Sequence, residues 1–288
     1  MKYLFFLLIF LLFSSCKSDL DLLIKTPPTG SLLDIRLTYD EKIDISYGKE
    51  EIQKYDLYLP STRNTRNPVI VLLHPGAWRI GDKGMLNPII QRFLDKRVNC
   101  AIVNTNYRLT STVGITYKNQ LDDINELLKK IKKDAPELGI ASNNFFLVGL
   151  SAGGHLAMLY ANSPDQDRFA NGVGGIVPPV NLATPEMRNG VLSNDILKVV
   201  GKTFTENPEE YYKVSPVYQF TPASPPTIVF FGGKDTVVPP EQANFCNQMM
   251  VLSRMKKSEF VFDPNRPHES NKWDDVIDKL VSFAEINL

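Results

Sequence analysis

The stretch FFLVGLSAGGH (residues 145–155) predicts both the fold and the chemistry of this chain. An apolar run typical of a buried strand leads into a Gly-x-Ser-x-Gly turn, and a helical pattern follows. A strand that turns at once into a helix brings backbone against backbone, and glycine fits there because it has no Cβ. We expect Ser151 at the N-terminus of the helix, where unpaired N–H groups favour negative charge. The pattern indicates a nucleophilic serine; the alternative is a glycine-rich turn with an incidental serine.

The composition is that of an ordinary globular protein with enough length for one large α/β domain. The 288 residues are 43% hydrophobic and 22% charged, and 32 Lys and Arg balance 32 Asp and Glu. A net charge of zero provides no long-range attraction to nucleic acid or to an anionic membrane surface. We therefore do not expect nucleic acid to be a partner.

An apolar run at residues 3–13, followed by Ser14, Ser15 and Cys16, sets the amino terminus apart. The run is too short to span a bilayer of about 30 Å as a helix, and it suits the core of a secretory signal peptide. Small residues before a cysteine resemble a bacterial lipoprotein cleavage site. We expect a signal peptide at residues 1–15 and a tether at residues 16–31, lipidated on Cys16.

Such a lipid would be the only membrane contact and would hold an exported protein in the cell envelope. Cleaved soluble secretion and an uncleaved anchor are the alternatives.

From residue 32 onward, the pattern predicts one domain, residues 32–288, with strands first and then alternating strands and helices. N-terminal strands are expected at 33–38, 42–46 and 53–59, and buried parallel strands at 69–73, 101–103, 145–150, 173–177 and 227–231, with a last strand at 257–262. Helices are expected at 88–95, 119–133, 152–161, 241–255 and 271–286.

We expect an α/β fold in which eight of these nine segments form a mostly parallel, doubly wound sheet with antiparallel N-terminal strands. Ligands of such sheets bind at the C-terminal ends of the strands. Residues 181–226 follow the sixth strand and interrupt the alternation with polar residues, prolines and tyrosines. This insertion is either a small lid beside the site or a long packed excursion.

Three histidines are candidates for the base that would activate Ser151. His155 lies one turn further along the same helix and is interpreted as a packing residue. His74 ends a strand and is interpreted as a residue that orders the following loop. His268 follows the last strand, in a loop that can bring its ring within about 3 Å of the serine hydroxyl. We therefore expect His268 to be the base.

A carboxylate must fix the tautomer of such a base and stabilise the imidazolium that forms. Asp235 follows the apolar run 227–231 in a glycine-rich turn, where its carboxylate would emerge at the same edge of the sheet. The chain order Ser151, Asp235, His268 is consistent with a Gly-x-Ser-x-Gly nucleophile turn followed by an acid and a base on later strands. The alternatives are that Asp235 only caps the next helix, and that Asp263 is the acid.

Further motifs resemble those of α/β-hydrolase esterases, and together the matches cover residues 55–268. The segments HPGAW (74–78) and GDK (81–83) resemble the His-Gly-Gly-x-Trp oxyanion loop. NYRL (106–109) and GGKDTVVP (232–239) fit the same family. The resemblance is to the carbohydrate-esterase and feruloyl-esterase (BD-FAE-like) branch, related to hormone-sensitive-lipase-like carboxylesterases and kynurenine formamidase. It implies an α/β-hydrolase fold.

The resemblance also implies roles for single residues. Backbone N–H groups of Gly76, Ala77 and Ala152 correspond to the donors of the oxyanion hole. Trp78 either forms a wall of the substrate pocket or anchors the loop. Tyr107 is a second candidate for substrate contact, with a structural role as its alternative.

These residues predict a serine esterase that works through an acyl-enzyme. The resemblance to the carbohydrate-esterase and feruloyl-esterase branch implies that its substrates are acetyl or feruloyl esters of carbohydrates. A small-molecule carboxylesterase or arylformamidase would use the same groups, and a non-catalytic surface binding domain is a third possibility. The sequence contains no metal-binding or nucleotide-binding motif, so no cofactor is expected. Cys100 and Cys246 are expected to be buried free thiols.

Overall fold

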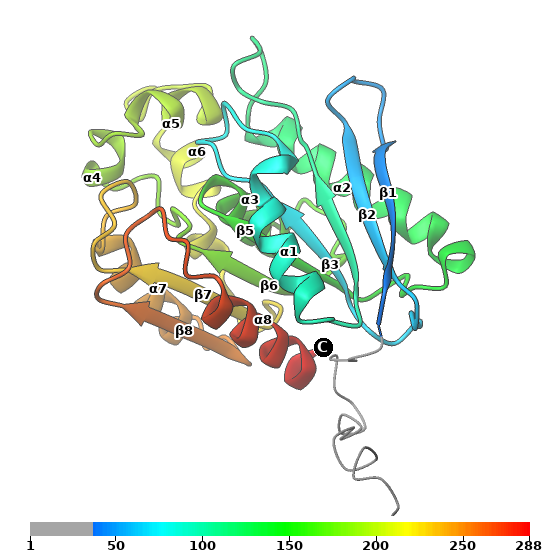
Figure 1. Ribbon diagram of the computed structural model, residues 1–288. Coiled ribbons are helices and arrows are strands. Elements are labelled where there is room, and N and C mark those ends of the chain that lie inside the picture. Colours follow the sequence, from blue (N-terminus) through cyan, green and yellow to red (C-terminus); the bar gives the residue numbers. More distant parts are fainter. Residues whose placement is uncertain (1–36) are drawn as a thin grey trace, which may run out of the picture. The chain divides into compact units, whose positions relative to one another are not determined.

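The computed structural model describes residues 37–288, which belong to one compact unit, Leu32–Leu288 (Figure 1). The expected signal peptide, Cys16 and the tether lie outside the described residues, as do residues 33–36. Within residues 37–288, no helix is both long enough and apolar enough to span a lipid bilayer.

Eight strands form one sheet, in the order β1-β2-β4-β3-β5-β6-β7-β8. The strands are β1 (Tyr39–Ser46), β2 (Lys54–Pro60), β3 (Val69–Leu73), β4 (Ala101–Thr105), β5 (Phe145–Leu150), β6 (Ala170–Ile176), β7 (Thr227–Gly232) and β8 (Ser258–Asp263). Strands β1 and β2, and β2 and β4, pair antiparallel, and all other neighbours pair parallel. This confirms the expected mostly parallel sheet with antiparallel N-terminal strands.

The beginning of the sheet differs from the expectation in one respect. Separate strands were expected at 33–38 and 42–46, but Leu37 and Thr38 are not in a strand and β1 is already formed at Tyr39. Most side chains of β1 are exposed, so few apolar residues mark where this edge strand begins.

The helices cover both faces of the sheet. They are α1 (Asn87–Asp95), α2 (Tyr117–Leu138), α3 (Ala152–Asn162), α4 (Pro185–Arg188), α5 (Ser193–Val200), α6 (Pro208–Lys213), α7 (Glu241–Leu252) and α8 (Asp274–Asn287), with 3-10 helices η2 (Lys83–Leu86) and η3 (Pro216–Gln219). Helices α1 and α8 lie on the face toward the viewer in Figure 1, and α2, α3 and α7 lie on the other.

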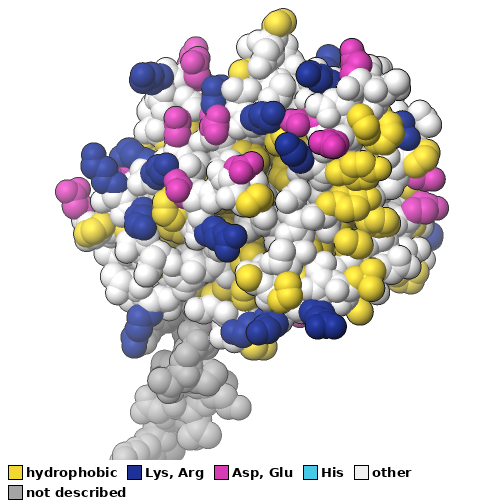
Figure 2. Space-filling view, turned by 180° about the vertical axis from the view of Figure 1, so that it is seen from behind, with side chains coloured by type: hydrophobic (Ala, Val, Ile, Leu, Met, Phe, Trp, Pro, Cys, Tyr) yellow, Lys and Arg dark blue, Asp and Glu magenta, His cyan; other side chains and the backbone are white. Residues whose placement is uncertain are grey.

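Each face of the sheet has its own apolar core. Along β3, Val71 and Leu73 point into the core beneath α2 and α3, and Ile70 and Leu72 point into the core beneath α1 and α8. This is the alternation expected of a strand buried on both sides. The surface in Figure 2 carries interspersed side chains of both charges, with apolar side chains gathered toward one edge.

The two cysteines of the domain lie in different cores, Cys100 in the α1–α8 core and Cys246 in the α2–α3–α7 core. Both are free and buried, as expected. Burial raises the pKa of each thiol above the usual range for cysteine.

The insertion (residues 181–226) contains α4, α5, α6 and η3. Helix η3 packs against α3, and Val214 and Val217 are completely buried. This part of the insertion is therefore packed onto the domain, and the lid interpretation stays a prediction.

Candidate active site

Ser151 lies at the turn between β5 and α3 in a strained backbone conformation, with φ +54° and ψ −118°. Its N–H donates to the carbonyl of Ile176 at 2.8 Å, which holds the turn against β6. A Cβ on Gly149 would lie 2.2 Å from the carbonyl carbon of Gly153, so only glycine allows α3 to begin this close to β5. The sequence motif is therefore a requirement of the backbone.

The structure brings Ser151, Asp235 and His268 together at the C-terminal edge of the sheet. His268 Nδ1 lies 2.7 Å from Asp235 Oδ2, and His268 Nε2 lies 3.0 Å from Ser151 Oγ. A carboxylate only accepts, so Nδ1 carries the proton and Nε2 is left to accept the serine hydroxyl. The three side chains follow β5, β7 and β8, whose parallel pairing places their C-terminal ends at one edge.

Asp235 also holds the turn that follows β7, but it does not cap the next helix, because the N-cap of α7 is Pro240 and no side chain caps that helix. Asp235 Oδ1 accepts the backbone N–H groups of Val237 at 2.9 Å and Val238 at 2.7 Å, while Oδ2 faces His268. Its side chain is only 2% exposed, so water competes little for the carboxylate. The alternative acid, Asp263, is exposed and accepts the N–H of Asn265, so it does not hold the histidine.

Arg266 fixes the loop that carries His268, a role that the sequence analysis did not identify. Its guanidinium is largely buried and donates to the carbonyl of Lys272 at 2.9 Å. Its own carbonyl accepts the N–H of Lys234 at 3.1 Å, which ties this loop to the turn that carries Asp235. Burial lowers the pKa of Arg266.

The oxyanion loop (residues 74–81) follows β3 and turns sharply at Gly76, whose φ is +126°. The Gly76 carbonyl accepts the N–H groups of Arg79 at 3.1 Å and Ile80 at 3.0 Å. Gly76 and Ala77 line the same cavity as Ser151.

The backbone donors expected from the family resemblance lie beside Ser151, at the start of α3 and along the oxyanion loop. In the part of the chain that the structure describes, no acceptor engages the N–H of Gly76, Ala77 or Ala152. The last of these lies at the N-terminus of α3, where the helix dipole also favours negative charge.

Trp78 and Tyr107 are completely buried and do not line the cavity, so the expected substrate contacts are wrong for both. The Trp78 indole donates to His155 and anchors the loop, which was the alternative interpretation. The Tyr107 hydroxyl donates to the carbonyl of His74 at 2.8 Å, and the Tyr107 and His74 rings stack with centroids 4.2 Å apart. His74 orders the loop, as expected, and burial lowers its pKa to about 4.

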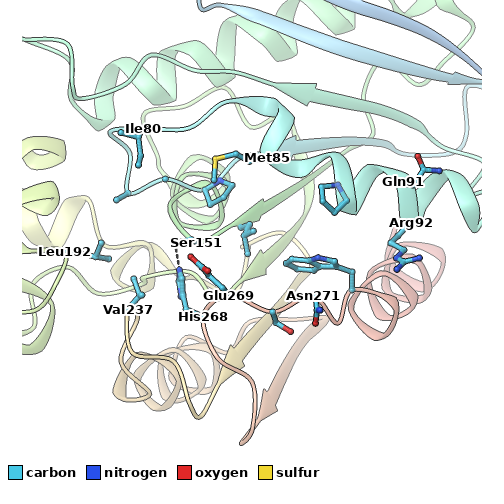
Figure 3. A pocket seen from close by; sticks show the side chains of 17 residues that line it. Ile80, Met85, Gln91, Arg92, Ser151, Leu192, Val237, His268, Glu269 and Asn271 are labelled. Atoms are coloured by element: carbon cyan, nitrogen blue, oxygen red, sulfur yellow. Dashed lines mark hydrogen bonds between the residues drawn. The ribbon is translucent and has the colours of Figure 1, made fainter.

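Ser151 and His268 line a cavity of about 1150 Å³, large enough for an ester with a bulky substituent on either side (Figure 3). One side of it is apolar, and the other combines polar side chains with a tryptophan. The apolar residues are Ile80, Met85, Leu192 and Val237, and the second group is Gln91, Arg92, Asn271 and Trp273. Figure 3 shows Ser151 between Leu192 and Val237 on one side and Gln91 and Arg92 on the other.

Neither group was predicted from the sequence, although one signal for the second group was available. Pro88, Gln91 and Arg92 have the i, i+3, i+4 spacing of one exposed face of α1. Across residues 37–288, no three His, Cys, Asp or Glu side chains gather in a way that could hold a metal ion.

Comparisons with known proteins identify the family of this chain. The family model BD-FAE matches residues 55–250. The probable carboxylic ester hydrolase LipM of Mycobacterium tuberculosis is 28% identical over 251 residues, which are 80% of this chain and 56% of that protein. Esterase LipC of the same organism is 27% identical over 249 residues, which are 80% of this chain and 60% of LipC. The chain thus spans little more than half the length of these curated relatives.

Solved structures show the same fold. A truncated carbohydrate esterase from gut microbiota has a TM-score of 0.71 at 18% identity, covering 86% of this chain and 97% of that one. Esterase B of Lactobacillus rhamnosis has a TM-score of 0.69 at 18% identity, covering 86% of each chain. The family model covers most of the described domain, and the fold is that of the esterase structures. The chain therefore belongs to the BD-FAE family of α/β hydrolases.

Proposed function

We propose that this protein is a serine esterase that cleaves carboxylic esters through an acyl-enzyme on Ser151. The observation that carries the proposal is the chain of hydrogen bonds from Asp235 through His268 to the Ser151 hydroxyl, on the wall of a large cavity. Family membership and the esterases among the relatives support it.

In the proposed reaction, Ser151 Oγ attacks the ester carbonyl while His268 Nε2 takes the hydroxyl proton. Asp235 keeps the ring in the required tautomer and stabilises the imidazolium. The carbonyl oxygen becomes an oxyanion beside the free N–H groups of the oxyanion loop and of α3, each worth about 3 kcal/mol of barrier. His268 then protonates the departing alcohol and activates the water that releases the acid.

We further propose that the alcohol part of the ester is a sugar and that the acyl part is acetyl or feruloyl. The side of the cavity with Arg92 and Gln91 offers donors and acceptors for hydroxyl groups, and Trp273 offers an aromatic face for a sugar ring. The opposite side, with Leu192 and Val237, suits an apolar acyl group. The chemistry of the cavity thus matches a molecule that is polar on one side of its ester bond.

Labelling with a fluorophosphonate probe tests the nucleophile. The wild type should label and hydrolyse p-nitrophenyl acetate, and Ser151→Ala should do neither while keeping its circular dichroism spectrum. Labelling that persists in the alanine variant would reject Ser151, and a folded wild type that never labels would favour the non-catalytic binding domain.

A substrate panel then separates the remaining possibilities. It contains acetylated and feruloylated sugars, ethyl acetate, p-nitrophenyl acetate and an N-formylated arylamine. We expect the highest kcat/KM on a sugar ester; preference for the formamide would identify an arylformamidase instead, and preference for ethyl acetate a small-molecule carboxylesterase.

We also propose that a lipid on Cys16 holds the domain in the cell envelope. Cells fed an alkyne-tagged palmitate should label the wild-type protein and not Cys16→Ser. Equal labelling of the two would reject this anchor.

A further inference from the structure

His155 makes two buried hydrogen bonds that the proposed reaction does not use. Its ring is completely buried on α3, one turn beyond Ser151. Trp78 Nε1–H donates to His155 Nδ1 at 3.0 Å, and the two rings meet edge to face with centroids 5.1 Å apart. His155 Nε2–H donates to the carbonyl of Val214 at 2.7 Å. One side chain therefore joins the oxyanion loop, the helix that follows the nucleophile, and the insertion.

The two partners of His155 require a neutral ring. An indole N–H can only donate and a carbonyl can only accept, so Nδ1 is unprotonated and Nε2 carries the proton. Burial lowers the pKa of His155 to about 4, which keeps the ring in this form. Both nitrogens are occupied, so the ring has no atom with which to act as a base. Its contribution to the reaction must be geometric.

The oxyanion loop needs an anchor because two successive residues have left-handed backbones. Ala77 has φ +51° and Trp78 has φ +60°, and this region costs a non-glycine residue about 1–2 kcal/mol. Such conformations persist only where the surroundings impose them. The carbonyl of Trp78 accepts from Thr110 N at 3.0 Å and Gln120 Nε2 at 2.9 Å, which holds the backbone from one side. The indole N–H, its only side-chain donor, is held by His155.

We propose that His155 is a positioning residue for the oxyanion hole. The expected hole has two halves on separate elements: the Gly76 and Ala77 N–H groups on the oxyanion loop, and the Ala152 N–H group on the first turn of α3. Trp78 is the residue after Ala77, and His155 lies three residues after Ala152, so their bond connects the two halves. This inference rests on the proposed function, because it concerns where the ester oxygen is held. A displacement of about 1 Å at such a site can cost roughly a hundredfold in rate.

Three substitutions separate the bonds of His155. Trp78→Phe removes the indole donor and keeps most of the ring volume. His155→Gln places an amide nitrogen near the position of Nε2, where it can still donate to Val214 but does not reach Trp78. His155→Asn places an amide oxygen near the position of Nδ1, where it can still accept from Trp78 but does not reach Val214. The two amides are a matched pair, because each keeps one bond and each leaves a similar gap.

We expect Trp78→Phe and His155→Gln to lower kcat for p-nitrophenyl acetate by roughly 10- to 100-fold, with KM within about threefold. His155→Asn should keep at least about ten times the kcat of His155→Gln. Binding of phenylboronic acid, which forms a tetrahedral adduct on the serine, should weaken in step with kcat/KM. Both substitutions remove the same hydrogen bond. The kcat of the double variant of Trp78→Phe and His155→Gln should therefore be no lower than that of the less active single variant.

Thermal unfolding of each variant controls for a general loss of structure, and the amide pair is compared at a temperature well below both transitions. Equal kcat in the two amide variants, or wild-type kcat in Trp78→Phe, would overturn the inference about His155. If the wild type still labels with the fluorophosphonate probe, the proposed function stands in that case. A wild type that neither labels nor hydrolyses any ester overturns the proposed function and this inference with it.

Discussion

Asp235→Asn is expected to abolish most of the activity without unfolding the protein. The change exchanges one carboxylate oxygen for an NH2 group at nearly constant shape. The Val237 and Val238 N–H groups both donate to Oδ1 of Asp235, so the asparagine must place its oxygen there. Its NH2 group then faces His268 Nδ1, 2.7 Å away in the wild type.

This orientation determines the magnitude. An NH2 group facing Nδ1 favours the tautomer with Nδ1 bare and the proton on Nε2, which points at Ser151 Oγ. A protonated Nε2 cannot accept the serine proton. Loss of the correct tautomer in a serine protease triad lowers kcat about 10⁴-fold, or about 5 kcal/mol of barrier, and we expect a similar loss here. The turn after β7 keeps its two caps, so the free energy of unfolding should change by less than about 1 kcal/mol.

The assay is kcat/KM for p-nitrophenyl acetate together with urea unfolding. Asp235→Ala should lose similar activity and in addition about 1–2 kcal/mol of stability, because both turn N–H groups lose their acceptor. Asp263→Asn is the matched control and should stay close to wild type. If Asp235→Asn keeps more than about a tenth of the wild-type activity, Asp235 does not orient His268 as inferred.

Three further outcomes are expected. Gly76 has φ +126°, and a Cβ there would lie 1.9 Å from the Ile80 carbonyl oxygen. Gly76→Ala should therefore displace the oxyanion loop and lower kcat at least about 100-fold. A kcat within threefold of wild type would contradict this interpretation of the loop. Leu192→Ala enlarges the apolar side of the cavity, and the ratio of kcat/KM for p-nitrophenyl octanoate over acetate should rise roughly tenfold; an unchanged ratio places the acyl group elsewhere. Burial lowers the pKa of His74 and His155 from 6.5 to about 4, so the unfolded chain binds more protons between these values. Stability should therefore fall as the pH is lowered through this window, by up to about 3 kcal/mol per histidine, and urea unfolding should show a shallower fall in His155→Asn.

Much of the site was predictable from local pattern. Gly149 was expected at a close backbone contact, and the structure places it there, because that requirement depends on residues adjacent in the chain. Ser151, Asp235 and His268 were expected to meet because each follows a strand of a parallel sheet, and the topology rule turns chain position into spatial proximity. Chain order and residue type were sufficient to choose one histidine of three.

The directions of side chains were harder to predict. Trp78 is next to Ala77 in the chain, and a motif alone cannot tell whether such a side chain faces the cavity or the core. The positive φ of Trp78 and its bond to His155 turn the indole inward. Tyr107 likewise follows β4 near the edge of the sheet but stacks on His74 beneath the loop.

The amino-acid sequence by itself determined which groups can perform the chemistry, because a nucleophile turn, a strand-end carboxylate and a loop histidine are recognisable from short segments. Only the tertiary structure decided what surrounds them. Leu192 comes from the insertion, Arg92 from α1 and Trp273 from the loop before α8, and they line one cavity because these segments pack at the same edge of one sheet. Packing of elements distant in the chain depends on the summed apolar contacts of two cores, which no single segment contains.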